Sequence, residues 1–178
     1  MKRQKTVKDS EATMTEMVLP NDTNTLNNLM GGKLMHWMDI VAAISAQRHS
    51  NSIVVTASAD SISFKNPIAL GNVVTLKAQV TRAFNTSMEV YIEVFAEDIP
   101  ANSKITTHRA FFTFVAVDEK GKPVQVPALK PITEEEKELF EGALRRRQLR
   151  LILGKRMDPK DAAELKSLFD LEDTSKNQ

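Results

Sequence analysis

The period of the apolar residues changes after residue 49 of this chain, and that change restricts the fold more than any other feature. Residues 33–49 follow a helical period near 3.6, which places Leu34, Trp37 and Val41 on one broad face. After them, four runs alternate with the period of a strand: residues 53–64, 72–81, 87–95 and 104–117. One-sided alternation is typical of a sheet with one packed face, which the apolar helix can cover. The sequence therefore predicts an α+β fold in which an antiparallel meander wraps around one long central helix.

Weaker patterns flank this core. Residues 13–18 alternate and predict a short strand, whereas residues 1–12 are polar and predict a solvated, flexible leader. Beyond residue 130 the pattern becomes helical again. We therefore expect three parts: the leader, a domain over residues 13–130, and a helical extension over residues 131–178.

A capping box formed by Thr133 and Glu136 predicts a helix over residues 133–153, with Gly154 at its end. The first turn of this helix is acidic and its last turns are basic, as the helix dipole favours.

A third, short helix is predicted to begin at Asp158 and Pro159 and to end near Asp170. Residues 171–178 are expected to fray.

The charge and hydropathy of the chain exclude several classes of function. Its 178 residues carry 24 basic and 23 acidic side chains, so it lacks the basic excess of a dedicated nucleic-acid binder. No apolar run approaches the roughly 20 residues that cross a bilayer, and the polar N-terminus lacks the apolar core of a signal peptide. We expect a cytoplasmic protein with no nucleic-acid partner and no membrane insertion.

Cysteine is absent, which excludes a disulfide framework, a thiolate nucleophile and a cysteine-ligated metal. The three histidines, His36, His49 and His108, have no metal-ligand spacing with a third donor. We therefore expect no metal and no other cofactor.

A single carboxylate interrupts the apolar helix. Between Leu34 and Gln47, Asp39 is the only formally charged side chain. An unpaired carboxylate is costly to bury, and His36 is its one local partner. Two interpretations stay open: a structural aspartate bonded to His36 or a nearby loop, and a general base or nucleophile in a cleft. Because one sheet covers a central helix incompletely, we expect that cleft at a dimer interface.

The residues before the helix offer further candidates. Gly31 and Gly32 stand where it begins, so free N–H groups and the helix dipole can polarise a carbonyl or receive an oxyanion there. A tight loop is the simpler interpretation of this pair. Asn24, in the preceding loop, is either an ordinary turn residue or an amide that orients water or binds a carbonyl oxygen.

Four blocks of the sequence, in this order, carry a resemblance to a known family: PNDTNTLNNLMGGKLMHWMD, SISFKNPIALGNVV, NTSMEVYIEVF and HRAFFTFVAVDEKGKPVQVP. They resemble the acyl-CoA thioesterases of the hot-dog fold, in the YciA-like and brain acyl-CoA hydrolase branch. The resemblance covers residues 13–130. It implies a hot-dog fold and hydrolysis of acyl-CoA to free fatty acid and CoA. It also implies a homodimer as the minimal unit and a hexamer, a trimer of dimers, as the usual assembly.

The resemblance assigns roles to four residues. Asp39 matches the family's base or nucleophile. Asn24 matches an asparagine that acts with the aspartate of the partner subunit to position water or substrate. The amides of Gly31 and Gly32 match the group that polarises the thioester carbonyl. Whether Asp39 activates water or attacks the thioester directly stays open.

The sequence departs from the family at the start of one strand. Where the family often has Arg-Thr-Ser or Arg-Ser-Ser, this chain has Asn85, Thr86 and Ser87. If the missing arginine helps to hold coenzyme A, Arg82 is the candidate to replace it. The predicted coenzyme A contacts are therefore Arg82, Asn85, Thr86 and Ser87, with coenzyme A as part of the substrate.

Two rival functions stay open on the same fold: a non-catalytic sensor of acyl-CoA or nucleotide, and a hot-dog hydratase or dehydratase. The basic end of the helix over residues 133–153 also has two interpretations. It is either a solvated face, or a contact for coenzyme A phosphates or another subunit.

Overall fold

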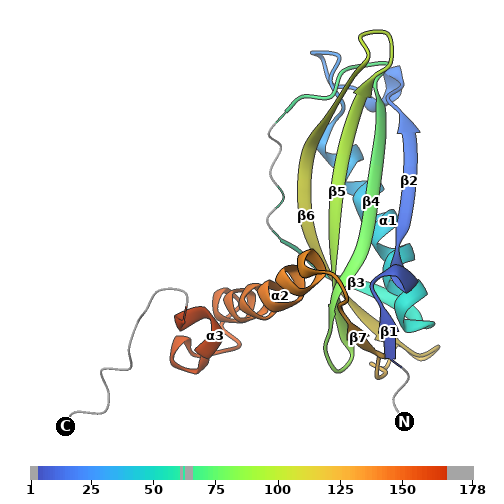
Figure 1. The fold of residues 1–178 in the computed structure, drawn as a ribbon. Helices are drawn as coiled ribbons and strands as arrows, with labels where there is room; N and C mark the ends of the chain where they lie inside the picture. The colour runs from blue at the N-terminus through green and yellow to red at the C-terminus, as the bar shows by residue number, and fades with distance from the viewer. Residues whose placement is uncertain (1–3, 61, 63–65, 168–178) are drawn as a thin grey trace. The chain divides into compact units, whose positions relative to one another are not determined.

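The structure is a computed structural model that describes residues 4–60, 62 and 66–167 (Figure 1). The chain divides into two units, Met1–Ile132 and Thr133–Gln178. All the residues predicted to carry chemistry belong to the first unit.

The first unit contains a five-stranded antiparallel sheet in the order β2-β4-β5-β6-β3. Helix α1 (Gly31–Ser50) contacts all five strands, and Figure 1 shows it running along one face of the sheet. The predicted α+β arrangement, a sheet around one long helix, is confirmed. The strands are β2 (Ala12–Met17), β3 (Ile53–Asp60), β4 (Val73–Ala83), β5 (Ser87–Asp98) and β6 (Ser103–Val117).

The order of the strands differs from the predicted meander. Strands β4, β5 and β6 pair consecutively, but β3 pairs with β6 at one edge and β2 pairs with β4 at the other. Strand β3 ends at Asp60 and β4 begins at Val73, a connection too long for a hairpin of two to five residues. The prediction of a four-strand meander in chain order is therefore wrong. Positions 61, 63 and 64 of the predicted strand lie outside the described residues.

The core lies between α1 and the sheet. The helix side chains Leu34, Trp37, Met38 and Val41 are buried, as predicted for the apolar face. Burying a side chain the size of valine or leucine is worth about 1.5–3 kcal/mol, so this layer fixes the helix on the sheet. The fully buried side chains of the facing strands include Leu76, Val80, Met88, Val90, Ile92 and Phe114.

The other flank of α1 is uncovered. Met35, Ile40 and Ile44 are 40%, 37% and 40% exposed, and Asp39 on the same flank is half-buried. This flank is therefore not buried within one chain. The incomplete cover expected from a single sheet is what the structure shows, because strands pack on one side of the helix only.

The N-terminal segment is not a solvated leader. Strand β1 (Gln4–Thr6) pairs in parallel with β7 (Ala128–Lys130), and a short 3-10 helix, η1, follows at Lys8–Ser10. Val7 is 2% exposed, and the hydroxyl of Ser10 accepts a hydrogen bond from the Val80 amide at 2.9 Å. The predicted leader is therefore wrong for residues 4–12, because strand pairing, the buried Val7 and the Ser10 hydrogen bond hold this segment on the sheet. Residues 1–3 lie outside the described residues.

The N-terminal segment also holds the end of α1. Lys5 donates from its ammonium to the Arg48 carbonyl and to the side-chain oxygen of Asn51, both at 2.6 Å. Asn51 ends the helix with a left-handed φ of 53°. His49, two residues earlier, is fully buried, and its Nε2 lies 2.9 Å from the Pro127 carbonyl. A cation at this end of a helix complements the dipole.

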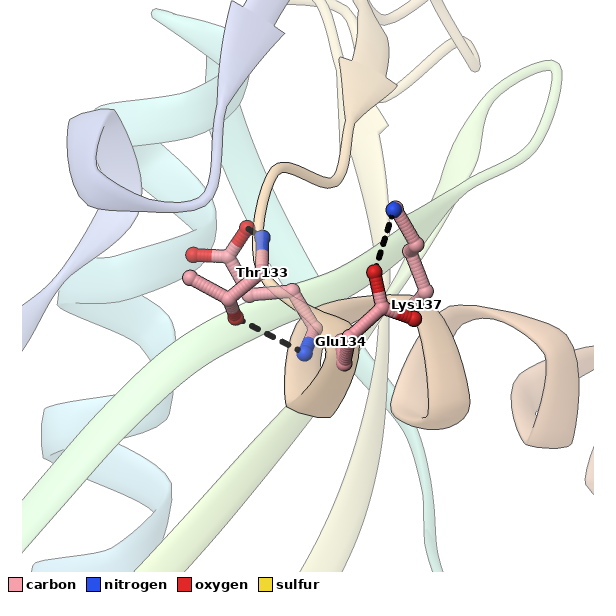
Figure 2. Close-up of polar contacts among 4 residues, drawn as sticks. Thr133, Glu134 and Lys137 are labelled. Carbon is pink, nitrogen blue, oxygen red and sulfur yellow. Dashed lines mark hydrogen bonds and ion pairs between the residues drawn. The ribbon is translucent and has the colours of Figure 1, made fainter.

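The second unit begins with helix α2 (Glu134–Leu153). Figure 2 shows its predicted capping box, which is confirmed: the Thr133 hydroxyl accepts from the Glu136 amide and the Glu136 carboxylate accepts from the Thr133 amide, both at 3.2 Å. Lys137 and Glu134 form an ion pair at 2.6 Å in the same turn. Gly154 is the C-cap, as predicted.

The end of the second unit is less regular than predicted. The carboxylate of Asp158 accepts a hydrogen bond from the Lys160 amide at 2.9 Å and caps a 3-10 turn, η3 (Pro159–Asp161). Helix α3 (Ala163–Lys166) follows. The predicted end near Asp170 and the predicted frayed tail lie outside the described residues. Within the described ranges, no helix is both long enough and apolar enough to span a bilayer.

Candidate active site

A loop between β2 and α1 carries the first candidate residues, and Asp22 holds this loop in place. The Asp22 carboxylate accepts a hydrogen bond from the Leu19 amide and pairs with the Lys33 ammonium, each at 3.1 Å. Its backbone carbonyl accepts from the Met30 amide at 2.9 Å. The Leu19 amide, followed by Lys33, lowers the pKa of Asp22, so this carboxylate stays ionised near neutral pH and ties the two ends of the loop together.

Asn24 lies in this loop with its side chain exposed. Its side-chain oxygen accepts hydrogen bonds from the amides of Leu26 at 2.9 Å and Asn28 at 3.2 Å. Because both bonds use the oxygen, the side-chain NH2 group is left to donate to a carbonyl or to water. The loop therefore presents Asn24 as a hydrogen-bond donor, which is the property its predicted role requires.

Gly31 and Gly32 are the first two residues of α1, so they do not form a tight loop. Met30, the N-cap residue, gives the helix no side-chain hydrogen bond. Neither glycine has the positive φ that favours glycine, and a Cβ added at Gly32 would meet no atom within 4 Å. The backbone conformation does not require glycine at either position, and a helix N-terminus without a side-chain cap has N–H groups that can donate to a ligand.

A pocket of about 400 Å³ brings Asn24 and Gly31 together. It lies where the N-terminal end of α1 meets the sheet, so loop, helix and strand all contribute to its walls. The described residues that line it are Asn24, Asn28, Leu29, Gly31, Leu34, Asn66, Pro67, Ile68 and His108.

Asp39 is bonded to a strand rather than to its helical neighbour His36. The Thr56 hydroxyl of β3 donates to the Asp39 carboxylate at 2.7 Å. Thr56 is exposed, and β3 is the edge strand of the sheet. The pair therefore lies on the uncovered flank of α1, where a carboxylate with one hydroxyl donor is open to a ligand.

One chain does not bring all the predicted catalytic residues together. Asp39 follows Gly31 by eight residues, which is about 12 Å along a helix. Asp39 is not among the described residues that line the pocket of Asn24 and Gly31. The structure thus contains two half-sites: a pocket with Asn24 and Gly31, and the pair Asp39–Thr56.

The predicted coenzyme A contacts gather at the hairpin between β4 and β5. The guanidinium of Arg82 lies 5.8 Å from the centre of the Phe84 ring. The carbonyls of Asn85 and Thr86 accept backbone hydrogen bonds at 3.0 and 2.9 Å, and Ser87 begins β5. None of these residues is among the described residues that line the 400 Å³ pocket.

Among the described residues, no three side chains of histidine, aspartate or glutamate gather closely enough to hold a metal ion.

Three residues at these half-sites were not identified from the sequence: Asp22, Thr56 and His108. Thr56 belongs to the alternating run 53–64, where it resembles any other polar strand residue. Its pairing with Asp39 spans 17 residues and depends on how β3 lies beside α1. No local pattern in the sequence reports such a contact.

The sequence matches the thioesterase superfamily over residues 26–101, a range that holds Gly31, Asp39 and Thr56. It is also 44% identical over 139 residues to a Bacillus subtilis protein named uncharacterized acyl-CoA thioester hydrolase YkhA, covering 78% of this chain and 81% of that protein. The chain belongs to the thioesterase superfamily.

Solved structures of this superfamily resemble the chain closely. A hexameric acyl-CoA thioesterase, solved without ligand, superposes with a TM-score of 0.83 at 42% identity, covering 85% of this chain and 97% of that one. An acyl-CoA hydrolase from Staphylococcus aureus was solved with butyryl coenzyme A, coenzyme A and coenzyme A disulfide. It gives a TM-score of 0.79 at 36% identity, covering 86% of this chain and 95% of that one. The predicted hot-dog fold and the predicted family are therefore confirmed.

The Staphylococcus aureus thioesterase has also been solved as three alanine variants, which replace one asparagine, one aspartate and one threonine. Along that chain the replaced residues are 15 and 17 positions apart. Asn24, Asp39 and Thr56 have the same two separations here. The same three residue types therefore recur at the same spacing in both proteins.

Proposed function

We propose that this protein is an acyl-CoA thioesterase, which hydrolyses acyl-CoA to a free carboxylic acid and CoA. The observation that carries the proposal is the hydrogen bond between Thr56 and Asp39, at 2.7 Å on the uncovered flank of α1. It supplies a held carboxylate without a cysteine, and a thioester is reactive enough to need no stronger nucleophile.

The chemistry assigned to the half-sites is general base catalysis. Asp39 takes a proton from water, and the water oxygen attacks the thioester carbonyl carbon. The resulting oxyanion accepts hydrogen bonds from the N–H groups of Gly31 and Gly32. When the C–S bond breaks, the thiolate of CoA takes the proton from Asp39. Direct attack by the carboxylate, with an anhydride that water then hydrolyses, uses the same residues.

Asn24 and Thr56 orient the reactants. The Asn24 NH2 group, fixed by the loop, donates to the attacking water or to the thioester carbonyl. The Thr56 hydroxyl donates to one oxygen of Asp39 and so leaves the other oxygen to accept the proton of water.

The complete site is proposed to form between two copies of the chain. Asp39 and Thr56 of one protomer then face Asn24 and Gly31 of the partner subunit. The exposed apolar side chains on this side support the proposal: Ile53 and Val55 on edge strand β3 are 54% and 48% exposed, beside the uncovered flank of α1. A trimer of such dimers, in the cytoplasm, is the proposed assembly, and light scattering measures its mass.

Within the chain, the proposed catalytic domain is residues 13–130 together with residues 4–12, which pack on it, and residues 131–178 are an extension. All four residues assigned to catalysis, and Thr56, lie in that domain.

The experiment is thiol release from acyl-CoA substrates of increasing chain length. The wild type is expected to release CoA, and Asp39→Ala and Asn24→Ala are each expected to lower kcat by about 10²-fold or more. Glu16→Ala, on the opposite edge strand β2, is a matched control that loses a half-buried carboxylate elsewhere and is expected to retain activity. Tight CoA binding without thiol release would instead indicate a sensor, and a hydroxyacyl product from an enoyl-CoA would indicate a hydratase.

A further inference from the structure

The Asp22 carboxylate bridges the loop that carries Asn24 and the first turn of α1. Asp22 is 8% exposed, so the bridge is buried. Its two oxygens have separate partners: Oδ2 accepts a hydrogen bond from the Leu19 amide, and Oδ1 pairs with the Lys33 ammonium, each at 3.1 Å. The carboxylate therefore has one bond on the loop side and one on the helix side.

The stability of the helix alone does not explain the position of Lys33. It is the third residue of α1, where a cation opposes the helix dipole, and the first turn contains no acidic residue. Its ammonium lies 3.1 Å from the Asp22 carboxylate and 5.5 Å from the centre of the Trp37 ring, one turn further along α1. Trp37 is 5% exposed, so the ammonium is held between a buried carboxylate and a buried ring. Lys33 therefore gives the loop a fixed point of attachment on the helix.

Backbone hydrogen bonds join this point of attachment to Asn24. The Asp22 carbonyl accepts from the Met30 amide at 2.9 Å, and the Asn24 amide donates to the Asn28 carbonyl at 2.8 Å. These bonds close residues 22–30 into one unit. A change in the orientation of Asp22 relative to α1 is therefore passed on to Asn24, two residues later.

We propose that the Asp22–Lys33 ion pair positions Asn24 for catalysis. The inference rests on the proposed thioesterase function and adds two positioning residues to it. Neither Asp22 nor Lys33 is among the described residues that line the pocket of Asn24 and Gly31, so the pair acts through Asn24 and not on the substrate. With the ion pair formed, the Asn24 NH2 group and the N–H groups at the start of α1 are aligned on one thioester group. Without it, the loop samples other orientations, and a smaller fraction of the bound substrate is aligned for attack.

The test measures kcat and KM for thiol release from the acyl-CoA that the wild type hydrolyses fastest. Lys33→Met removes the cation and keeps the length of the side chain, Asp22→Asn removes the charge and keeps an acceptor, and Lys33→Arg keeps the ion pair. The Lys33 side chain is 37% exposed, so Lys33→Met is expected to fold even if Asp22→Asn does not. Lys137→Met is the matched control, because it breaks an ion pair with Glu134 in α2.

Lys33→Met and Asp22→Asn are each expected to lower kcat by about threefold to thirtyfold with little change in KM, because the contacts to the substrate stay and only their alignment is lost. Lys33→Arg and Lys137→Met are expected to keep kcat within about twofold of the wild type. An unchanged kcat in Lys33→Met would overturn the inference.

A second measurement, in the Asn24→Ala background, separates positioning from a general loss of structure. If the ion pair acts through Asn24, Lys33→Met lowers kcat no further once the Asn24 amide is gone. A full additional loss in that background would overturn the inference, even with wild-type turnover intact. A wild type that releases no thiol from any acyl-CoA would instead overturn the proposed function, and this inference with it.

Discussion

At the scale of single residues, the Thr56 hydroxyl decides how the Asp39 carboxylate is held. It donates one hydrogen bond at 2.7 Å, and within the described residues no cation pairs with Asp39. A hydrogen bond to a charged group contributes about 1.5–3 kcal/mol. Thr56 is therefore a positioning residue for the proposed base.

Replacing Thr56 tests this role. Thr56→Val keeps the shape but removes the donor, and it is expected to lower kcat by about tenfold to a hundredfold with little change in KM. Thr56→Ser keeps the hydroxyl and is the matched control. Equal kcat values for the valine and serine variants would show that the hydroxyl does not act through Asp39.

The sequence identifies some of these residues and not others. Asp39 is visible because a charge in an apolar helix is anomalous, and Gly31 because it begins that helix. Thr56 and His108 sit in ordinary alternating strands, and their places in the half-sites arise from contacts with segments far away in the chain. Residue type and spacing do not encode such contacts.

At the scale of elements, the C-terminal end of α1 depends on a buried histidine. Burial lowers the pKa of His49, the hydrogen bond to the Pro127 carbonyl opposes this, and nearby Lys5 adds to the lowering while Asp9 opposes it. An unfolded histidine titrates near pH 6.5. Below that pH the unfolded chain binds a proton that the folded chain does not, so the free energy of unfolding is largest above pH 6.5 and falls as the solution is acidified.

Thermal unfolding at pH 7.5 and 5.5 measures this effect. The wild type is expected to have a lower Tm at pH 5.5, and His49→Gln is expected to show a smaller difference between the two pH values. Some difference remains, because burial lowers the pKa of His108 as well. His36→Gln, at an exposed position of α1, is the control. A difference as large in His49→Gln as in the wild type would contradict the prediction.

The hairpin between β4 and β5 is the element proposed to contact coenzyme A. If the Arg82 guanidinium binds a phosphate, Arg82→Ala is expected to raise KM by about tenfold and to leave kcat unchanged, since a charge-assisted bond is made equally in ground and transition states. Arg109→Ala, which removes a guanidinium paired with Glu93 at 3.1 Å on the exposed side of β6, is the control. Identical KM values for the two variants would remove Arg82 from the site.

Elements with local signals were predictable, and their arrangement was not. The capping box of α2 and the long apolar helix are read from neighbouring residues. The pairing of β3 with β6 is a contact between distant segments, as is the pairing of β1 with β7. The alternation of apolar and polar residues indicates which face of a strand is buried. It does not determine the order of the strands, because several orders are compatible with the same buried faces.

At the scale of the whole molecule, the two half-sites predict that two chains complete each active site. Mixing Asp39→Ala with Asn24→Ala tests this. In a mixed dimer, the Asp39→Ala chain still supplies Asn24, and the Asn24→Ala chain still supplies Asp39. These two residues form one working site, and the second site of the dimer lacks both. Random reassociation of the two inactive variants in equal amounts is expected to restore about a quarter of wild-type activity.

If Asp39 and Asn24 of the same chain worked together, the mixture would stay inactive, because no chain has both residues. The control is the Asp39→Ala variant alone, taken through the same denaturation and renaturation. Wild-type chains treated in parallel report the yield of refolding.

Strand β3 combines the threonine that holds the proposed base with an unpaired, apolar border of the sheet. Proteins usually protect exposed edge strands against aggregation by placing lysine or proline along them. Under the proposed function, lysine or proline on β3 would displace Asp39 or block the second copy of the chain. If the proposed dimer forms through β3, engineering for higher expression should leave this strand untouched, and dilution below the dissociation constant of that dimer should lower the activity per chain.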